Sequence, residues 1–421
     1  MTARHFFTIP DWVKTRVPTG IKTSVKVGQF LLVYFGALSR ASTKDTRRDQ
    51  ILEAVLVVRR DLEYHTCRVE PPSDVVPFLR RLFRIYSDQK DHQPGGLYRT
   101  GKIWEAALRK WRKNYLAALE SGDAERLREV LRCFHRNDTI VAIGIEIEVL
   151  RDLFSKPFRS ACFVTNLITK YQAFPRVCDP RFLPFVDEGK VGCPIGVPFD
   201  GQTLTPSGFR HAYYASEFSR AIDLDARRDL VICELGGGYA NLPRILKQAH
   251  PGRSFTYVIL DLPQMLPVAA YFLKANCPES RLGLWDELRA VPLSRSELRK
   301  YDFVLLPNWD IARLPDAGVD AVINTASLAE MDPDIVENYL EQIRRITARG
   351  GHFYTVNRDR GVEYPALDGT RETGMDVWNM EWPGWHKKME RPSWGDLHWG
   401  AWEQMDYKEV VLQRAAVSEA S

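Results

Sequence analysis

The sequence has no cysteine pair of metal-binding spacing, no internal repeat and no low-complexity tract. Its seven cysteines are odd in number and include no C-x-x-C pair, so zinc-ribbon and thioredoxin-type motifs are excluded. A reducing, cytoplasmic compartment fits this pattern best, with most thiols acting as small apolar groups. The net charge of only +4 over 421 residues argues against a nucleic-acid-binding protein.

The sequence also lacks a convincing membrane span near its N-terminus. The apolar run "VGQFLLVYFGAL" (residues 27–38) is too short to cross a bilayer as a helix. It lies behind Pro10 and Pro18, too far from the start for a typical signal peptide. We therefore expect residues 1–50 to form a basic leader that packs on the body of the protein. The alternative is a helix lying peripherally on an anionic surface, at the inner face of the membrane. The basic residues that flank the run are Lys14, Arg16, Lys22, Lys26, Arg40, Lys44, Arg47 and Arg48.

The length favours two domains. Residues 51–205 are predicted to be mostly helical, and the stretch 101–120 carries apolar residues at helical spacing. Residues 175–207 are rich in proline and glycine and are predicted to form a long loop. Residues 206–421 form the predicted second domain, which ends in a tryptophan-rich segment holding six of the eleven tryptophans.

From about residue 220, short apolar runs alternate with helical stretches. The predicted strands are "LVICEL", "FTYVILD", "FVLLPN", "VDAVINT", "HFYTVN" and "YKEVVLQR". A helix is predicted from Pro333, with Asp332 as its N-cap and Gly350-Gly351 as its stop. Nearly continuous apolar strands between helices indicate a parallel sheet covered on both faces. We therefore expect an α/β, Rossmann-like fold with a seven-stranded, mainly parallel sheet, preceded by the helical region.

Three consecutive glycines follow the first of these strands, in "ICELGGGYANL" (residues 232–242). A strand, a glycine turn and a helix typically build a nucleotide site at the carboxyl ends of parallel strands. Gly236 and Gly238 allow the sharp turn and a close approach of the ligand to the backbone. Asp261 ends the next strand, where a carboxylate is placed to accept hydrogen bonds from both hydroxyls of a ribose.

Two ligand classes use this layout. A dinucleotide site requires a third glycine, but Asn241 stands there. Glu234, two residues before the first glycine, would repel a pyrophosphate but suits a ligand with an ammonium group. S-adenosylmethionine has an ammonium, a ribose and no phosphate, so we expect it as the cofactor. A dinucleotide, or a fold without a cofactor, remains the alternative.

Several segments resemble known families. The stretch "ARLPDAGVDAVINTASLAEM" resembles the signature that leads into the fourth strand of class I methyltransferases. The last three hundred residues or so resemble the family of sugar O-methyltransferases. The segments that carry this resemblance are "CFHRN", "VGCPIGVPF", "RHAYYASEF", "ICELGGGYANLPRIL", "YVILDLPQM", "VLLPNWDI", "INTASLAEMDPDIVENYLEQI", "YTVNRDR" and "DLHWGAWEQMDYKEVVLQR".

The resemblance implies S-adenosylmethionine-dependent transfer of a methyl group to a hydroxyl of a sugar or glycan. Asn308 and Trp309 follow the third strand, where that fold holds the adenine. Tyr214 is expected to wall the same pocket. The full set of expected cofactor contacts is Tyr214, Glu234, Gly236, Gly237, Gly238, Asp261, Leu262, Asn308 and Trp309. The N-terminal region before Phe83 shows no resemblance.

An alcohol is a weak nucleophile at neutral pH, so methyl transfer to oxygen benefits from a general base. His211 and Glu330 are the two candidates. Histidine is the commonest proton acceptor near pH 7, and Glu330 follows the fourth strand, where the acceptor is expected. Structural roles, in core packing for His211 and in an ion pair or cap for Glu330, are the alternatives. The expected substrate contacts are Asn324, Ser327, Asn357 and Arg358, and no metal site is predicted.

Two other functions remain open at this point. One is an O-methyltransferase for a non-sugar acceptor, such as a phenol or a natural-product scaffold. The other is a non-catalytic, membrane-associated scaffold that has kept the fold. The tryptophans between Trp378 and Trp402 either stack on pyranose rings or bury the tail against the body.

Overall fold

The computed structural model describes residues 46–64, 75–141, 143–358, 363–365, 371–373, 382–396 and 407–416. The predicted basic leader up to residue 45 lies outside these ranges, and so do Trp378, Trp399 and Trp402. Predictions made for them therefore stay predictions. Among the described residues, no helix combines the length and the apolarity that crossing a bilayer requires.

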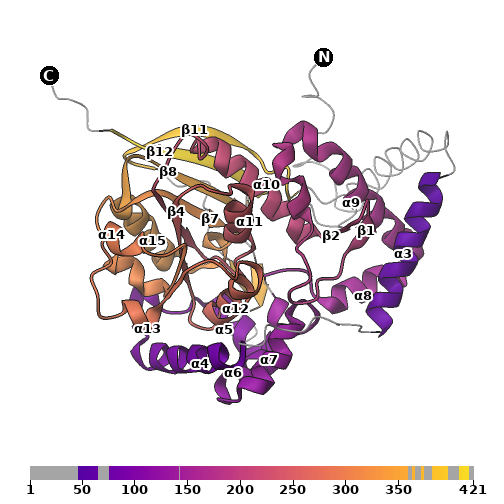
Figure 1. Ribbon diagram of the computed structural model, residues 1–421, viewed down its shortest axis with the longest axis horizontal. Coiled ribbons are helices and arrows are strands. Elements are labelled where there is room, and N and C mark those ends of the chain that lie inside the picture. Colours follow the sequence, from indigo (N-terminus) through magenta and orange to yellow (C-terminus); the bar gives the residue numbers. More distant parts are fainter. Residues whose placement is uncertain are drawn as a thin grey trace.

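Eight strands of the described chain form one twisted sheet at the centre of the molecule (Figure 1). Six neighbouring strands, from β8 to β5 by way of β3, pair with one another in parallel, and β12 adds to β8 in antiparallel register. β11 then pairs antiparallel with β12. The order across the sheet is β11 (Trp385–Pro392), β12 (Tyr407–Arg414), β8 (Thr347–Arg358), β7 (Val319–Thr325), β3 (Leu230–Leu235), β4 (Phe255–Asp261), β6 (Phe303–Pro307) and β5 (Leu282–Leu284).

The sheet confirms the predicted Rossmann-like α/β fold, and all six predicted strands are present. The predicted count of seven strands is wrong, because the sheet has eight. The two strands without a sequence signal are edge strands. β5 is only three residues long, and β11 ("WHKKMERP") is largely exposed and charged, as edges that resist aggregation often are.

Helices connect the parallel strands and cover the sheet. α10 (Pro206–Ala221) packs against α11 (Asn241–Ala249), which in turn contacts α12 (Leu266–Asn276). α15 (Pro333–Ile346) begins at the predicted proline but ends four residues before Gly350, because β8 starts at Thr347. The shorter helical segments between the sheet strands are α13 (Trp285–Leu288), α14 (Arg295–Leu298), η6 (Asn308–Arg313) and η7 (Leu328–Glu330). Two further short strands, β9 (Glu363–Pro365) and β10 (Arg371–Thr373), pair with each other.

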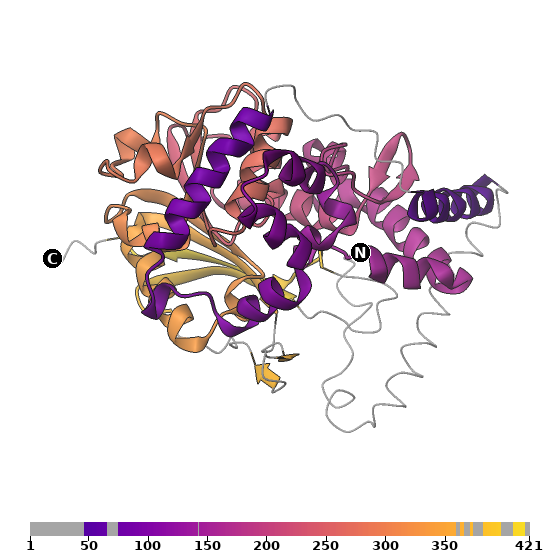
Figure 2. The same cartoon turned by 90° about the horizontal axis from the view of Figure 1, so that it is seen from below.

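The helices before residue 205 divide between two places (Figures 1 and 2). α3 (Thr46–Tyr64) packs with α8 (Ile147–Ser155), α9 (Pro157–Val177) and the hairpin of β1 (Val197–Phe199) and β2 (Gln202–Leu204). The second group lies along the sheet domain, where α4 contacts α12. Its members are α4 (Val75–His92), η1 (Gly96–Tyr98), α5 (Lys102–Ala106), η2 (Ala107–Trp111), α6 (Lys113–Glu120), α7 (Ala124–Arg132), η3 (Phe134–Arg136) and η4 (Asp138–Ile140).

The stretch 101–120 is helical over most of its length, as its apolar spacing predicts, but the helix is interrupted. The chain forms α5, then a π-helical turn, and leaves the helical conformation at Arg112 (φ −110°, ψ 35°) before α6 begins. The side chain of Arg112 is fully buried, and its Nε donates to the carbonyl of Val141 at 2.9 Å. The break lets a buried guanidinium tie this segment to the loop that precedes α8.

The predicted long loop over residues 175–207 is also wrong in part. α9 continues through Pro175 to Val177, and the 3₁₀ helix η5 (Pro180–Val186) and the β1–β2 hairpin follow. Each of these elements is short, so proline and glycine dominate the local composition and mask them.

Glu409 on β12 is a buried carboxylate that joins three elements. It accepts hydrogen bonds from Tyr213 Oη (2.6 Å, α10), Tyr354 Oη (2.9 Å, β8) and Arg391 Nε (2.9 Å, β11). These bonds hold the antiparallel end of the sheet against α10.

Replacing Glu409 with alanine is expected to lower the free energy of unfolding by about 2–4 kcal/mol, because two buried phenols and one guanidinium lose their acceptor. Urea-induced unfolding measures this change. Glu390→Ala is the matched control: Glu390 lies on the neighbouring strand, pairs with Lys387 and is partly exposed, so its loss is expected to cost less than about 0.5 kcal/mol. Equal costs for both variants would contradict the role given to Glu409.

Candidate functional site

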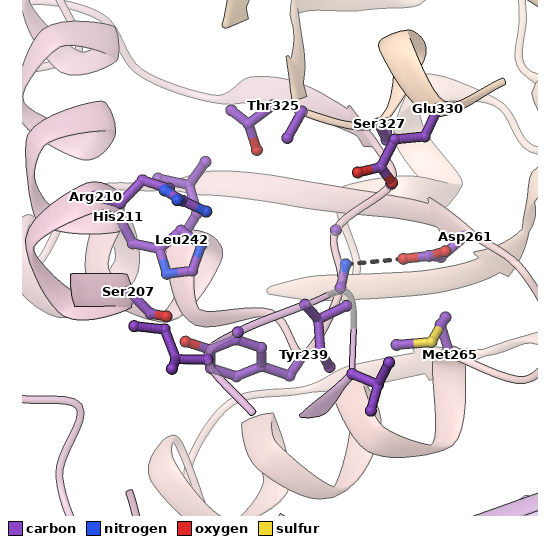
Figure 3. Close-up of a pocket in the computed structure, with 18 of the residues that line it drawn as sticks. Ser207, Arg210, His211, Tyr239, Leu242, Asp261, Met265, Thr325, Ser327 and Glu330 are labelled. Carbon is purple, nitrogen blue, oxygen red and sulfur yellow. Dashed lines mark hydrogen bonds between the residues drawn. The ribbon is translucent and has the colours of Figure 1, made fainter. Parts of the chain in front are cut away.

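A cavity of about 620 Å³ opens at the carboxyl ends of β3, β4, β6 and β7 (Figure 3). Twelve of the fifteen predicted site residues line it. These are His211, Tyr214, Glu234, Gly236, Gly237, Gly238, Asp261, Leu262, Asn308, Ser327, Glu330 and Arg358. The structure therefore brings most of the predicted site together in one place.

The glycine turn between β3 and α11 forms the floor of the cavity. Gly236 (φ +79°) and Gly238 (φ +57°) adopt left-handed conformations that favour glycine. A Cβ at Gly236 would lie 2.7 Å from Ser327 Cβ, so no larger residue fits there without a shift. A Cβ at Gly237 would meet Ile259 Cγ2 at the same distance. The turn thus needs glycine at positions 236 and 237 for packing, as well as for the approach of a ligand.

Asp261 lies at the end of β4 beside this turn. Its Oδ2 accepts a hydrogen bond from the Gly238 amide (2.8 Å), and its Oδ1 accepts one from the Leu262 amide (2.7 Å) (Figure 3). Burial raises the pKa of this carboxyl to about 6, although the two backbone donors and Arg112 oppose the shift. The carboxylate is therefore ionised at neutral pH and held at a fixed angle to the turn.

Glu234 lies on β3 directly below the glycines. It is buried, and Tyr257 Oη donates a hydrogen bond to its Oε2 at 3.0 Å. Desolvation raises the pKa of Glu234 to about 8, with a further contribution from Asp261. A cationic ligand group next to this carboxyl would favour its ionised form.

Asn308 follows β6, and the hydrogen bonds that its side-chain amide donates fix the orientation of the side chain. Its Nδ2 donates to the carbonyl of Tyr98 (3.1 Å) and to Tyr339 Oη (2.7 Å). Its Oδ1 is buried and has no hydrogen-bond partner among the described residues. A buried, oriented acceptor at the wall of a cavity calls for a donor on a ligand. The neighbouring Trp309, predicted as a second adenine contact, does not line the cavity.

Asn324 and Asn357 do not line the cavity, so the structure gives no support to their predicted role as substrate contacts. Asn324 is fully buried and donates to the Leu235 carbonyl (2.9 Å) and to Ser327 Oγ (2.5 Å). Asn357 donates to Asn324 Oδ1 (2.9 Å) and accepts from the Ala329 amide (3.2 Å). The two amides therefore join the ends of β3, β7 and β8 rather than contact a ligand.

Glu330 points into the cavity from the turn after β7 (Figure 3). Trp104 Nε1 donates a hydrogen bond to its Oε2 at 3.1 Å. The N-terminal segment that carries Trp104 also contacts the chain just after Glu330. There Arg99 forms ion pairs with Asp332 and Asp334, each at 2.8 Å. These contacts could not be predicted from the sequence, since Trp104 belongs to no motif.

His211 lies on α10, on the wall opposite Glu330 (Figure 3). Its Nδ1 lies 3.0 Å from Asn241 Nδ2, and Arg244 Nε donates to the Oδ1 of the same amide at 2.8 Å. This arrangement makes Nδ1 the acceptor, so the neutral ring carries its hydrogen on Nε2. Burial and the nearby Arg210 and Arg244 lower the pKa of His211 to about 3. The ring is thus a neutral hydrogen-bond donor toward the cavity.

The C-terminal segment completes the wall beside α10. Asp396 is buried, pairs with Arg210 Nε (2.8 Å) and accepts a hydrogen bond from Tyr214 Oη (2.7 Å). Tyr407 packs against Arg210 and also accepts a hydrogen bond from Arg358 Nε at 3.2 Å. Arg210 and Tyr214 therefore hold their positions in the cavity wall through residues almost two hundred positions away.

The described tryptophans of the C-terminal segment pack on the protein body. Trp382 and Trp385 lie against Phe353, and Trp394 lies against Tyr213. None of these three lines the cavity. In this part of the segment, the structure supports the alternative in which the rings bury the tail.

Within the described ranges, no group of three histidine, cysteine, aspartate or glutamate side chains is arranged to hold a metal ion. Asp332, which follows Glu330 closely, is already engaged by Arg99 and by the Lys102 amide.

No protein-family model matches the sequence, and no curated protein matches it. Solved structures resemble part of the fold. The magnesium protoporphyrin IX methyltransferase of Synechocystis PCC 6803, solved with bound SAM, is 13% identical over 52% of this chain and 87% of that one (TM-score 0.31). A SAM-dependent methyltransferase of Aquifex aeolicus is 12% identical over 50% and 98% (TM-score 0.29). The [4+2]-cyclase SpnF is 11% identical over 60% and 96% (TM-score 0.34). Similarities at this level carry no information on substrate or reaction.

Gly236→Ala is expected to destabilise the protein by about 2–4 kcal/mol, through a left-handed alanine and the collision with Ser327. Gly252→Ala separates the two effects, because Gly252 has the same φ of +79° and no atom near its would-be Cβ. This control is expected to cost about 1–2 kcal/mol. Chemical denaturation measures both, and equal losses would show that the contact with Ser327 is unimportant.

Proposed function

We propose that this chain is an S-adenosylmethionine-dependent O-methyltransferase whose acceptor is a hydroxyl of a sugar or glycan. The observation that carries the proposal is a set of three buried acceptors on one cavity wall: Asp261, Glu234 and the Oδ1 of Asn308. Their chemistry matches the ribose hydroxyls, the ammonium and the adenine amino group of this cofactor.

Each group fits on physical grounds. Asp261 is ionised at neutral pH and can accept charge-assisted hydrogen bonds from two hydroxyls. Glu234 lies under the turn, where an ammonium would repay the cost of burying its charge. Asn308 offers an acceptor whose orientation is fixed by Tyr98 and Tyr339. The backbone of the glycine turn leaves room for the ligand between these groups.

A dinucleotide fits less well. A pyrophosphate at the start of α11 would lie near Glu234 and would find Asn241 where the dinucleotide motif has its third glycine. In this structure Asn241 instead joins α10 to α11 through His211 and Arg244. The alternative of a scaffold without a cofactor is weaker as well, because the buried Oδ1 of Asn308 would then lack a donor, which is costly.

When bound, S-adenosylmethionine supplies an electrophilic methyl group on its sulfonium. We assign Glu330 as the general base that takes the proton of the acceptor hydroxyl while its oxygen attacks. Trp104 orients the carboxylate of Glu330 by donating a hydrogen bond to its Oε2. His211 is the less suitable base of the two predicted, since its Nδ1 is engaged and its Nε2 carries a hydrogen. It is better suited to donate a hydrogen bond to the acceptor.

The sugar assignment draws on the resemblance of the sequence segments and on the polar wall formed by Ser207, Arg210 and His211. The alternative is a non-sugar acceptor, which the apolar residues elsewhere in the cavity favour. Incubation with labelled S-adenosylmethionine and a panel of glycans and phenols tests the choice directly. Label in phenols alone would overturn the sugar assignment.

S-adenosylhomocysteine is expected to bind more tightly as pH rises from 5.5 to 8.5. Asp261 ionises at about 6 and Glu234 at about 8 in the free protein, and the ionised forms bind the hydroxyls and the ammonium. Calorimetry measures this profile. Asp261→Asn is expected to remove the dependence near pH 6 and to weaken binding roughly 10- to 100-fold. Glu234→Gln is expected to remove the dependence near pH 8.

A pH-independent affinity in the wild-type protein would contradict the assignment of these carboxyls. The control is the thermal midpoint of each variant, because Asp261 also accepts two backbone hydrogen bonds. No binding at millimolar ligand by a folded wild-type protein would overturn the proposed cofactor.

Glu330→Gln is expected to lower kcat by roughly 10²–10⁴-fold, the usual yield of positioned proton transfer, with little change in S-adenosylhomocysteine affinity. His211→Asn is expected to lower kcat less than about tenfold, since only a neutral donor is lost. Steady-state kinetics with the best acceptor of the panel compares the two. A larger loss in the histidine variant would reverse the assignment of the base.

A further inference from the structure

The cavity has a second wall that the cofactor does not explain. It is built from the loop before α8 and from α8 and α9, and most of its side chains are apolar, although Glu146, Arg159 and Asn166 also line it. The apolar members include Ile143, Ile145, Leu150, Leu153, Phe163 and Leu167. The wall begins directly at the cofactor end, because a Cβ on Gly238 would lie 3.7 Å from Ile143 Cγ2. The apolar wall and the glycine turn therefore belong to one continuous space.

Helical spacing points these side chains into the cavity. Phe163 and Leu167 lie one turn apart on α9, and Val149 and Leu153 lie one turn apart on α8. Val149 also lines the cavity and is 54% exposed. The apolar wall thus runs from the buried glycine turn out to solvent, which is unusual unless something apolar covers it.

Polar groups line two further parts of the cavity. Ser207, Arg210 and His211 come from α10, and Thr325 and Glu330 lie opposite them, at the end of β7 and in the turn after it (Figure 3). A ligand in this space can place a head group between these hydrogen-bonding groups and the proposed base while another part of it meets aliphatic and aromatic side chains. Such a division matches an amphiphilic molecule better than a free sugar, whose hydroxyls would face the apolar wall without partners.

We propose that the acceptor carries an apolar group, an alkyl chain or an aromatic ring, attached to its hydroxyl-bearing head. The head lies against α10 and Glu330, and the apolar group lies against α8 and α9 and leads out past Val149. This inference rests on the proposed methyltransferase function and deepens it by naming the acceptor class.

The test uses the protein saturated with S-adenosylhomocysteine. Methyl, octyl and phenyl β-glucosides are titrated by calorimetry, with the octyl compound kept below its micelle-forming concentration. Each buried methylene raises affinity about fourfold, so the octyl or the phenyl compound is expected to bind at least tenfold more tightly than the methyl compound. The octyl and phenyl arms distinguish a lipid chain from an aromatic group.

Val149→Gln and Leu153→Gln place polar groups on the apolar wall and are expected to reduce this preference at least fivefold. Val149 is largely exposed, so its variant keeps the test valid if Leu153→Gln fails to fold. Val177→Gln is the matched control, because Val177 is an exposed apolar residue at the end of α9 that does not line the cavity. It is expected to leave the preference unchanged.

Equal affinity for the three glucosides, or no measurable binding of the octyl and phenyl compounds, would overturn the inference while S-adenosylhomocysteine binding still supports the proposed function. A preference that survives in both wall variants would overturn it too, because the apolar group would then lie elsewhere. Failure of S-adenosylhomocysteine itself to bind is a separate result, and it would overturn the proposed function first.

Discussion

The candidate site depends on a buried hydrogen-bond network formed by Asn324, Ser327 and Asn357. Asn324 and Ser327 both donate hydrogen bonds to the Leu235 carbonyl at the end of β3. From β8, Asn357 donates a hydrogen bond to the side-chain oxygen of Asn324. The network therefore fixes how the ends of three neighbouring strands meet. It also sets the turn that carries Glu330 and the position of Ser327 against Gly236. With all three side chains buried, loss of any member leaves unpaired polar atoms inside the protein, at about 1–3 kcal/mol each.

The elements of the fold that could be predicted are those marked by a pattern of neighbouring residues in the sequence. The strands β3, β4, β6 and β7 are nearly continuous apolar runs, and glycines, prolines or charged residues separate them. The glycine turn and Asp261 were found for the same reason, since their spacing follows from a strand, a turn and a helix. Asn324 and Asn357 were predicted as substrate contacts because an amide after a strand has the same appearance in sequence whether it contacts a ligand or a neighbouring strand. Only the packing of β3, β7 and β8 decides between the two.

The N-terminal contributions were not predictable in the same way. Trp104 lies in a stretch that reads as one regular helix, but a π-helical turn and the buried Arg112 redirect the chain there. The hydrogen bond from Trp104 to Glu330 spans 226 positions, and no short motif records a contact of that range. The apolar side chains of α8 and α9 were hidden for a related reason. In sequence they read as ordinary core positions, and the cavity that they face exists only when α10 lies opposite them.

The site is assembled from both ends of the described chain. Trp104 and Arg99 come from its beginning, and Asp396 and Tyr407 come from its end, where they hold Arg210 in place. During synthesis the ribosome releases the sheet strands in order, and N-terminal parts generally fold first. The nascent protein can therefore form its glycine turn early, yet the wall around α10 stays incomplete until the last strand has emerged. A prematurely terminated product would keep the central part of the fold without a finished cavity, so translation itself sets when the cavity is complete.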